Sequence, residues 1–410
     1  MAKSNQHTFN RPFDSLEDFV DAVSDRFQCP VTLEDSNHHL LAYSSHDDRT
    51  DEARIATIIG RRVPERVINK FWKEGVIPKL NTSNEPLVIP QINEIGLGNR
   101  IAVSIRKDQE VLGYIWILEL EKKLNENDLA DLKLAASKAK NQLLQLNIQK
   151  KRKEKNHQEL LWQLITGEAF EHNQIAKQLM PTGFQSTGPL AVVVFSFREI
   201  NQDLSKKLVY VAKTTQKINI LIQTIDENQL ILLISPSNQE DLDDAKEFIE
   251  TFKVQVKERF GLDDIISGCG YAYQQYEYVK ASYEEALKVV ELKQVYQDEL
   301  EDMDFYHELG IFKYIDVLKQ QKHIKRMQLN PVIERLQLYD KANKTNLLES
   351  LEVTLDKDSN VNDAAKELHC HVNTLNYRLK RIQEITSINL KDPVQKLGLY
   401  LDLKLKRQQK

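Results

Sequence analysis

The chain has 410 residues, of which 41% are hydrophobic and 29% charged, and its formal net charge is −5. At roughly 100–200 residues per domain, this length and composition predict two to four folded domains, and they exclude collagen-like and low-complexity chains. No stretch approaches the roughly 18 uninterrupted apolar residues of a membrane helix, the first residues lack the apolar core of a signal peptide, and three scattered cysteines exclude a disulfide scaffold. We therefore expect a cytoplasmic, helix-rich, multidomain protein without contact to a membrane.

The first domain, residues 1–124, has the pattern of a small α/β sensor. Ser15 followed by acidic Asp18 predicts a helix start, and Pro30 ends that helix before a short strand hairpin. A second hairpin is expected from strands at 100–105 and 111–118, after an irregular middle. This order is that of a GAF or PAS type of sensor, whose sheet can hold a ligand on one face, and a purely structural α/β domain remains an equal alternative.

Three side chains on or beside these strands are candidates for binding an acidic or zwitterionic metabolite. Packing or a surface charge would explain each of them as well. They are Tyr43, Arg100 and Trp116.

Residues 125–168 form a long linker helix, because leucines recur at steps of three and four with few breaks. Gly167 is expected to end it, and a helix of this length between domains predicts pairing with its twin in a homodimer or higher homo-oligomer. The basic run at 150–155 suggests either a nucleic-acid patch or the solvated face of the helix. We favour the solvated face, because the neighbouring leucines supply the buried one.

The third domain, residues 169–300, has a regular α/β rhythm. Its order of strand, helix, two strands, helix and strand predicts a ferredoxin-like or nucleotide-cyclase-like fold. A tight turn at 226–228 joins the second and third strands, and one face of the last helix is apolar. That face consists of Tyr283, Ala286, Leu287 and Val290.

The end of the chain is helical and differs in charge from the rest. Residues 341–410 carry 13 Lys and Arg against 9 Asp and Glu, an excess of four positive charges, whereas the other 340 residues carry a net −9. A mildly basic segment on an acidic body is typical of a separate DNA-binding module. A helical connector, 301–340, precedes this segment.

Within the basic segment, 361–379 predicts a helix-turn-helix. Small Ala364 and Ala365 allow a second helix to cross closely, and His369-Cys370-His371 forms the turn. The second helix then enters the major groove of DNA, with short polar side chains toward the bases and cations toward the phosphates. The residues expected to contact DNA are His371, Asn373, Thr374, Asn376, Tyr377, Arg378, Lys380 and Arg381.

Other kinds of site have weaker support in the sequence. A metal site at 369–371 is disfavoured because adjacent residues point apart and no second pair of ligands lies nearby. Gly96-Leu97-Gly98 lacks the third glycine of a phosphate-binding loop. No catalytic constellation is present, so we expect neither an enzyme nor a cofactor.

The last 70 residues resemble the helix-turn-helix of PucR/CdaR-type bacterial transcription regulators. Two positions depart from the pattern of that family: Asn376 stands where arginine is common, and Ser387 where glycine is usual. The resemblance extends over most of the chain, because 190–292 is similar to the degenerate GGDEF-like domain of the family and 305–318 to its connector. The matching residues are His371, Asn373, Thr374, Leu375, Tyr377, Arg378, Leu379, Ile382, Asp392 and Pro393.

The resemblance implies a ligand-responsive activator of a catabolic operon. The GAF-like front end is most similar to Bacillus-type regulators of alanine or proline use, so the implied effector is an amino acid or another small metabolite. A working cyclase of the GGDEF type needs two glycines at the hairpin, where this chain has 226–229, Asp-Glu-Asn-Gln. The remaining alternatives are a signalling scaffold whose terminal helices bind protein and, with less support, a cyclic-dinucleotide enzyme.

Overall fold

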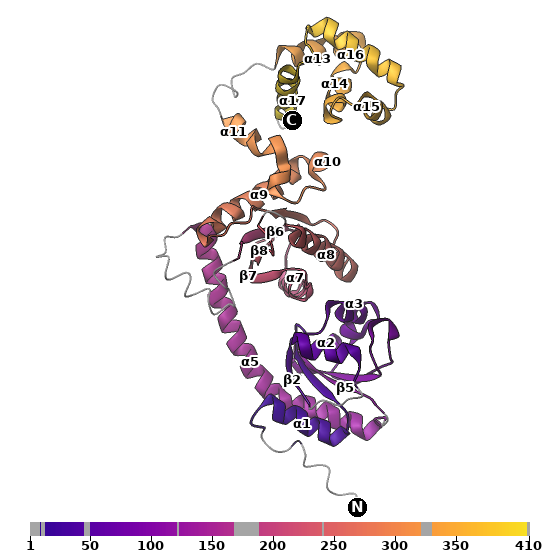
Figure 1. The fold of residues 1–410 in the computed structure, drawn as a ribbon, viewed down its shortest axis with the longest axis vertical. Helices are drawn as coiled ribbons and strands as arrows, with labels where there is room; N and C mark the ends of the chain where they lie inside the picture. Colours follow the sequence, from indigo (N-terminus) through magenta and orange to yellow (C-terminus); the bar gives the residue numbers. More distant parts are fainter. Residues whose placement is uncertain are drawn as a thin grey trace, which may run out of the picture. The chain divides into compact units, whose positions relative to one another are not determined.

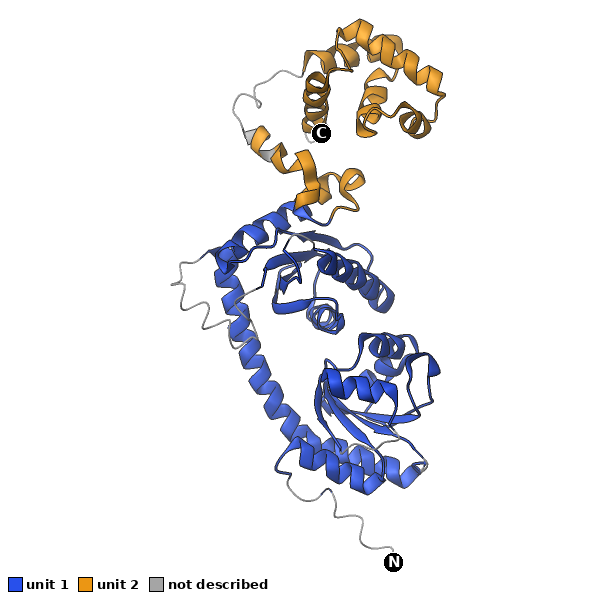
Figure 2. Ribbon diagram, in the orientation of Figure 1, with its two compact units in different colours: residues 1–290, 304–306 blue, residues 291–303, 307–410 orange. Residues whose placement is uncertain are grey.

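The structure is a computed structural model that describes residues 9, 13–44, 50–120, 123–167, 188–239, 242–320 and 330–407. It divides into two compact units, the first comprising 1–290 with 304–306 and the second comprising 291–303 with 307–410 (Figure 2). The multidomain α+β class predicted from the sequence is confirmed. Parts of the predicted domains, including Glu168 at the end of the linker and 169–187 of the third domain, lie outside the described residues.

The sensor contains a five-stranded antiparallel sheet in the order β2-β1-β5-β4-β3. Ser15 caps its first helix, with the Ser15 hydroxyl accepting a hydrogen bond from the Asp18 amide at 3.0 Å, as the sequence pattern predicted. The first hairpin pairs β1 with β2, and the second pairs β4 with β5. The elements are α1 (Leu16–Phe27), β1 (Val31–Asp35), β2 (Leu40–Tyr43), α2 (Glu52–Gly60), α3 (Glu65–Lys73), α4 (Val76–Thr82), β3 (Leu87–Ile89), η2 (Asn93–Ile95), β4 (Arg100–Lys107) and β5 (Glu110–Leu118).

The prediction of an irregular middle in the sensor was wrong. Three short helices, α2 to α4, occupy most of it and cover one face of the sheet. These helices have only seven to nine residues, and such short helices owe their stability to packing rather than to their own sequence. The opposite face of the sheet packs against α1 and the first half of α5, so the sheet is covered on both sides (Figure 1).

The predicted linker is one continuous helix, α5 (Glu126–Thr166). Asn125 caps its start, and Gly167 ends it in the left-handed conformation with φ 73°, as predicted. The first half of α5 packs on the sensor, whereas Leu160, Leu161 and Leu164 pack on the next domain. The basic run is partly paired within the protein: Lys150 Nζ lies 2.9 Å from Asp35 Oδ2, and Lys151 Nζ lies 2.7 Å from Glu110 Oε1. These ion pairs support the interpretation of this run as a helix surface.

The third domain has a four-stranded antiparallel sheet in the order β7-β8-β6-β9, which is the predicted ferredoxin-like arrangement. Helices α7 and α8 cover one face, and α5 and α9 cover the other (Figure 1). Ala286 and Val290 are buried in the second layer, as their spacing predicted. The elements are β6 (Ala191–Ser196), α7 (Gln202–Thr214), β7 (Asn219–Asp226), β8 (Gln229–Ser235), α8 (Asp243–Phe260), β9 (Ile266–Cys269), η4 (Tyr276–Tyr278) and α9 (Val279–Val295).

All regular elements that the structure describes in the second unit are helices. A connector follows α9, and a bundle of five helices completes the chain. The bundle has its own apolar core, to which Ile333, Leu351, Ile382 and Leu403 belong. The elements are α10 (Gln297–Leu300), η5 (Tyr306–Tyr314), α11 (Ile315–Gln320), α13 (Pro331–Asn343), α14 (Leu347–Asp356), α15 (Val361–Glu367), α16 (Val372–Thr386) and α17 (Pro393–Arg407).

Candidate functional site

Helices α15 and α16 form the helix-turn-helix predicted from the sequence. Ala364 and Ala365 are buried against Leu375 of the second helix, which explains why small residues stand there. Cys370 packs half-buried into the same small core, and His371 caps α16 by accepting a hydrogen bond from the Asn373 amide at 3.2 Å. This geometry leaves α16 free to present its opposite side outward.

The outward side of α16 is polar and carries an exposed aromatic ring. At about 100° per residue, Asn373, Tyr377 and Lys380 lie opposite the buried Leu375 and Ile382. Tyr377 keeps 70% of its surface exposed, and the neighbouring side chains of Thr374 and Asn376 are exposed as well. The exposed groups on this side of α16 therefore include hydrogen-bonding amides and hydroxyls, an aromatic ring and an ammonium group.

Two of the predicted cations have partners inside the bundle. Arg378 is half-buried, and its Nη1 donates a hydrogen bond to the Ser350 hydroxyl on α14 at 3.0 Å. Arg381 donates from Nε to the Tyr339 hydroxyl at 3.2 Å and pairs with Glu384 at 2.9 Å. Sequence reasoning missed Ser350 and Tyr339, because no local pattern links α13 or α14 to residues about 30 to 40 positions later.

The turn after α16 explains one departure from the family pattern. Ser387 ends the helix with φ 60°, in the left-handed region where glycine is the least strained residue. A serine there therefore keeps the same turn at a small conformational cost.

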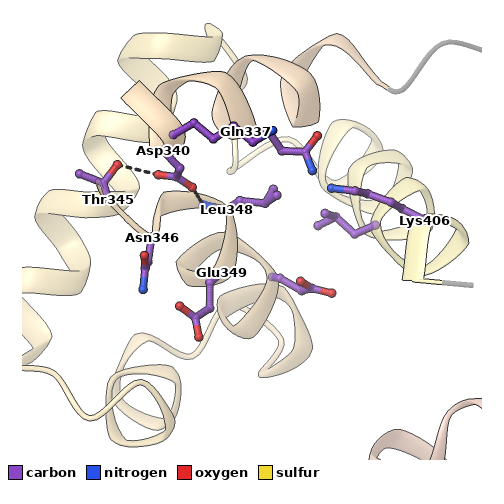
Figure 3. Close-up of a pocket in the computed structure, with 10 residues that line it drawn as sticks. Gln337, Asp340, Thr345, Asn346, Leu348, Glu349 and Lys406 are labelled. Atoms are coloured by element: carbon purple, nitrogen blue, oxygen red, sulfur yellow. Dashed lines mark hydrogen bonds between the residues drawn. The ribbon is translucent and has the colours of Figure 1, made fainter. Parts of the chain in front are cut away.

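A groove of about 490 Å³ lies between α13, α14 and α17 of the bundle (Figure 3). Asp340 on the polar wall of this groove is bonded within the protein: it accepts hydrogen bonds from the Thr345 hydroxyl at 2.6 Å and from the amides of Leu347 and Leu348 at 2.8 and 3.0 Å. Asp340 thus satisfies the first amides of α14. The lining residues are Gln337, Asp340, Lys341, Thr345, Asn346, Leu348, Glu349, Glu352, Leu403 and Lys406.

The three effector candidates share one face of the sensor sheet. Thr32 pairs with Tyr43 on one side and with Trp116 on the other, and Arg100 lies two residues from Ala102, the next partner of Trp116. Because directly paired residues of an antiparallel sheet point to the same side, Tyr43, Trp116 and Arg100 all face the layer of α2 to α4.

Arg100 and Trp116 are engaged by neighbours on that face. Arg100 Nη2 lies 2.6 and 2.8 Å from the two carboxylate oxygens of Asp51, which also accepts from the Gly98 amide. Burial opposes ionisation of Asp51, but Arg100 and the backbone donors outweigh it and hold the pKa of Asp51 below its ordinary value. Trp116 stacks on Phe71 with 4.9 Å between ring centroids.

A buried glutamate connects this face to the third domain. Glu34 Oε2 accepts from Trp116 Nε1 at 3.0 Å and lies 3.2 Å from Nδ1 of the buried His38. Burial raises the pKa of Glu34, although His38 and Arg100 act in the opposite direction. His38 Nε2 lies 2.9 Å from the hydroxyl of Tyr210 on α7. A hydrogen-bonded path therefore runs from Trp116 to α7, and sequence reasoning missed Glu34, His38 and Tyr210.

Asn228 in the hairpin turn of the third domain fixes the position of the turn through hydrogen bonds. Asn228 Oδ1 accepts a hydrogen bond from the Ile200 amide at 3.0 Å, and the Asn228 carbonyl accepts from the Phe197 amide at 2.9 Å. The turn is thereby tied to the loop between β6 and α7, and Glu227 in the turn has φ 45°.

The alternative sites of the sequence analysis find no support in the described ranges. There, no group of three or more His, Cys, Asp or Glu side chains is arranged to hold a metal ion, including the region of 369–371. Gly96 ends η2 against the side chain of Glu52, at a distance of 2.9 Å between its expected Cβ position and the Glu52 Cβ. None of the described helices combines the length and the apolarity that crossing a bilayer requires.

Comparisons with known proteins agree with these features. The PucR C-terminal helix-turn-helix domain matches residues 347–405, and a GGDEF-like domain matches 166–292. The DNA-binding transcriptional activator AdeR of Bacillus subtilis is 42% identical over 97% of this chain and 94% of its own. The proline-responsive transcriptional activator PutR of the same organism is 29% identical over 96% of this chain and 97% of its own.

A solved regulator of polyketide synthase expression from Bifidobacterium adolescentis is 15% identical over 62% of this chain and 93% of its own, with a TM-score of only 0.28. The two matching domains and the full-length similarity to AdeR place the chain in a family: it belongs to the PucR/CdaR-type bacterial transcriptional regulators.

Proposed function

We propose that this chain is a DNA-binding transcriptional activator of a catabolic operon that acts in the cytoplasm. The observation that carries the proposal is the exposed face of α16, on which Asn373, Tyr377 and Lys380 stand opposite the buried side. This face offers hydrogen-bonding groups for base edges and a cation for phosphate. The full-length similarity to two transcriptional activators supports the same function.

The effector of this regulator is a small amino acid, with proline and alanine as the first probes. The support is the similarity to a proline-responsive activator and the polar groups on one sensor face. Tyr43 is half-buried on that face, whereas Arg100 and Trp116 act there through Asp51 and Glu34. A ligand that displaced Trp116 from Glu34 would alter the hydrogen-bonded path to Tyr210.

The GGDEF-like domain acts as a relay rather than as a cyclase. Its hairpin turn lacks both glycines, and Asn228 closes it onto the Ile200 amide. The Ile200 amide, engaged in this way, is not available to a phosphate. Incubation with GTP and magnesium is expected to yield no cyclic dinucleotide, and clear turnover would revive the enzyme alternative.

Two copies of the chain act together, with α5 as the pairing element. Leu134, Leu146 and Ile148 of α5 are 40%, 42% and 66% exposed, although their residue type favours burial. A dimer presents two recognition helices to two half-sites and gains affinity from their linkage. Light scattering at micromolar protein is expected to give twice the chain mass, and a monomer would contradict this assignment.

The decisive experiment selects fragments of genomic DNA with the purified protein, with and without proline or alanine. Enrichment of one or two promoter regions is expected, and the genes downstream identify the pathway. DNA affinity should fall steeply with salt, as phosphate contacts require. The absence of enrichment at low salt would instead favour the scaffold alternative.

Replacement of Tyr377 by alanine is expected to weaken operator binding roughly tenfold to a hundredfold, because a contact in the centre of the interface is lost. Tyr314→Ala is the matched control, since Tyr314 is 62% exposed but lies in the connector. Titration of labelled operator measures both variants. Equal affinity of the Tyr377→Ala variant and the wild type would show that α16 does not face the DNA.

The bond between Arg378 and Ser350 predicts a positioning role for Arg378. If Arg378 orients α16, both Arg378→Ala and Ser350→Ala weaken operator binding and leave the dependence on salt unchanged. A lost phosphate contact instead reduces the slope of log affinity against log salt by about 0.9, which is the expected result for Lys380→Ala. A reduced slope for Arg378→Ala alone would assign Arg378 to the DNA backbone.

A further inference from the structure

A lysine without any exposed surface lies where the connector meets the helical bundle of the second unit. Lys404 on α17 is 0% exposed, and its Nζ lies 2.7 Å from Glu299 Oε1 and 2.8 Å from Asp356 Oδ1. Glu299 belongs to α10 of the connector, whereas Asp356 is the last residue of α14 in the bundle. One ammonium group thus joins three segments that are distant in sequence.

The surroundings of Lys404 explain why the charge is tolerated. An ammonium group removed from water is stable only when partners of opposite charge and hydrogen bonds replace its hydration. Glu299 provides an opposite charge and a hydrogen bond, Asp356 provides a second opposite charge, and the Nζ also lies 5.3 Å from the centroid of the Tyr400 ring. Lysine is almost never fully buried without such partners.

Apolar contacts of the connector surround the same point. Tyr296 is 2% exposed, and its hydroxyl donates to the Lys404 carbonyl at 3.4 Å. Its ring packs on Phe312 with 4.7 Å between centroids, and Leu300 at the end of α10 is fully buried. The chain enters this region directly from α9, the last helix of the GGDEF-like domain.

We propose that Lys404 is a latch that docks the connector on the DNA-binding bundle, so that α10, α14 and α17 move as one body. Asp356 lies four residues before Asn360, the cap of the first helix of the helix-turn-helix. A displacement of α10 is therefore passed to the base of the DNA-reading motif through one ion-paired group. The role in signal transmission rests on the proposed function, whereas the docking itself does not.

Amide hydrogen exchange of the full chain tests the docking. The amides of Leu300 and Met303, which donate to Tyr296 and Leu300 at 3.0 Å, report on α10. Lys404→Met leaves two carboxylates side by side without their cation, and these amides are expected to exchange on the order of a hundredfold faster. Glu299→Gln keeps Lys404 paired with Asp356, so the same amides are expected to exchange only about tenfold faster than in the wild type.

Lys396→Met is the matched control, because it makes the same change on the same helix. Lys396 lies 3.8 Å from a fully exposed Asp358, so exchange at Leu300 and Met303 should match the wild type. Wild-type exchange in both test variants would overturn the latch. If Lys404→Met also accelerates the hydrogen exchange of the α16 amides, this substitution has loosened the whole bundle. The exchange of Leu300 and Met303 in the Glu299→Gln variant then decides whether Lys404 docks the connector.

DNA affinity measured with and without proline tests transmission. Glu299→Gln is expected to bring the ratio of the two affinities toward one, because α10 no longer moves with the bundle. If the ratio of the two affinities is unchanged in Glu299→Gln although the Leu300 amide exchanges faster, the role in signal transmission is refuted and the docking role of Lys404 stands. A wild-type chain that binds no DNA would refute the proposed function. Amide hydrogen exchange at Leu300 and Met303 would still test the docking of the connector.

Discussion

Replacement of Arg100 by leucine is expected to lower the free energy of unfolding of the sensor by about 3 kcal/mol. The side chains of Arg100 and Asp51 are 8% and 14% exposed, so the change leaves a carboxylate with little access to water and without its cation. Thermal unfolding followed by the fluorescence of Trp72 and Trp116, two of the three tryptophans, measures the loss.

An exposed pair of the same type provides the control. Arg198 pairs with Asp264 at side-chain exposures of 87% and 51%, and Arg198→Ala is expected to change stability by less than about 1 kcal/mol. Asp51→Asn combined with Arg100→Leu should recover part of the loss, since no buried charge is then left alone. If Arg100→Leu is as stable as the wild type but no longer responds to proline, Arg100 binds the effector directly.

The Arg100 and Asp51 pair also gives the sensor a defined pH dependence. The folded pKa of Asp51 lies below its ordinary value, so the unfolded chain takes up the proton first as the pH falls. The contribution of the pair is therefore complete above about pH 4 and disappears on further acidification. The Arg100→Leu variant should lack this acid-sensitive part of the stability.

Replacement of Gly270 by alanine is expected to destabilise the GGDEF-like domain by about 3 kcal/mol. A Cβ at Gly270 would lie 2.0 Å from the Ser282 carbonyl oxygen and 2.6 Å from its hydroxyl, where α9 crosses the sheet. That hydroxyl accepts from the Val192 amide at 2.9 Å and donates to the Tyr271 carbonyl at 2.8 Å. Because a backbone carbonyl blocks the space, α9 must move away and both hydrogen bonds weaken.

Denaturant unfolding followed by circular dichroism measures this effect, and Gly398→Ala is its control. Gly398 lies inside α17, and apart from its chain neighbours and the backbone of its own helix no described atom lies within 4 Å of its expected Cβ position. Alanine there should raise stability by up to about 1 kcal/mol, because alanine favours a helix. A Gly270→Ala variant as stable as the wild type would show that α9 is not held at this distance from β9.

The local sequence was sufficient for every element whose pattern is long or dense. The 41 residues of α5 follow from recurring leucines and a glycine stop, and the helix-turn-helix follows from two alanines, a polar turn and a basic run. It was not sufficient for α2 to α4, since helices this short are stable only against the sheet.

By itself, the sequence determined the family and the multidomain α+β class, and it predicted which helix faces DNA, because these depend on periodicity and on residue types within about 20 positions. Only the tertiary structure decided which candidate side chains are available. In the folded chain, Arg378 donates a hydrogen bond to Ser350 and Arg100 forms an ion pair with Asp51. Lys404 is buried between the carboxylates of Glu299 and Asp356. Charged groups find partners across 28 to 105 positions of sequence. Desolvation makes these partnerships obligatory, and no local pattern records them.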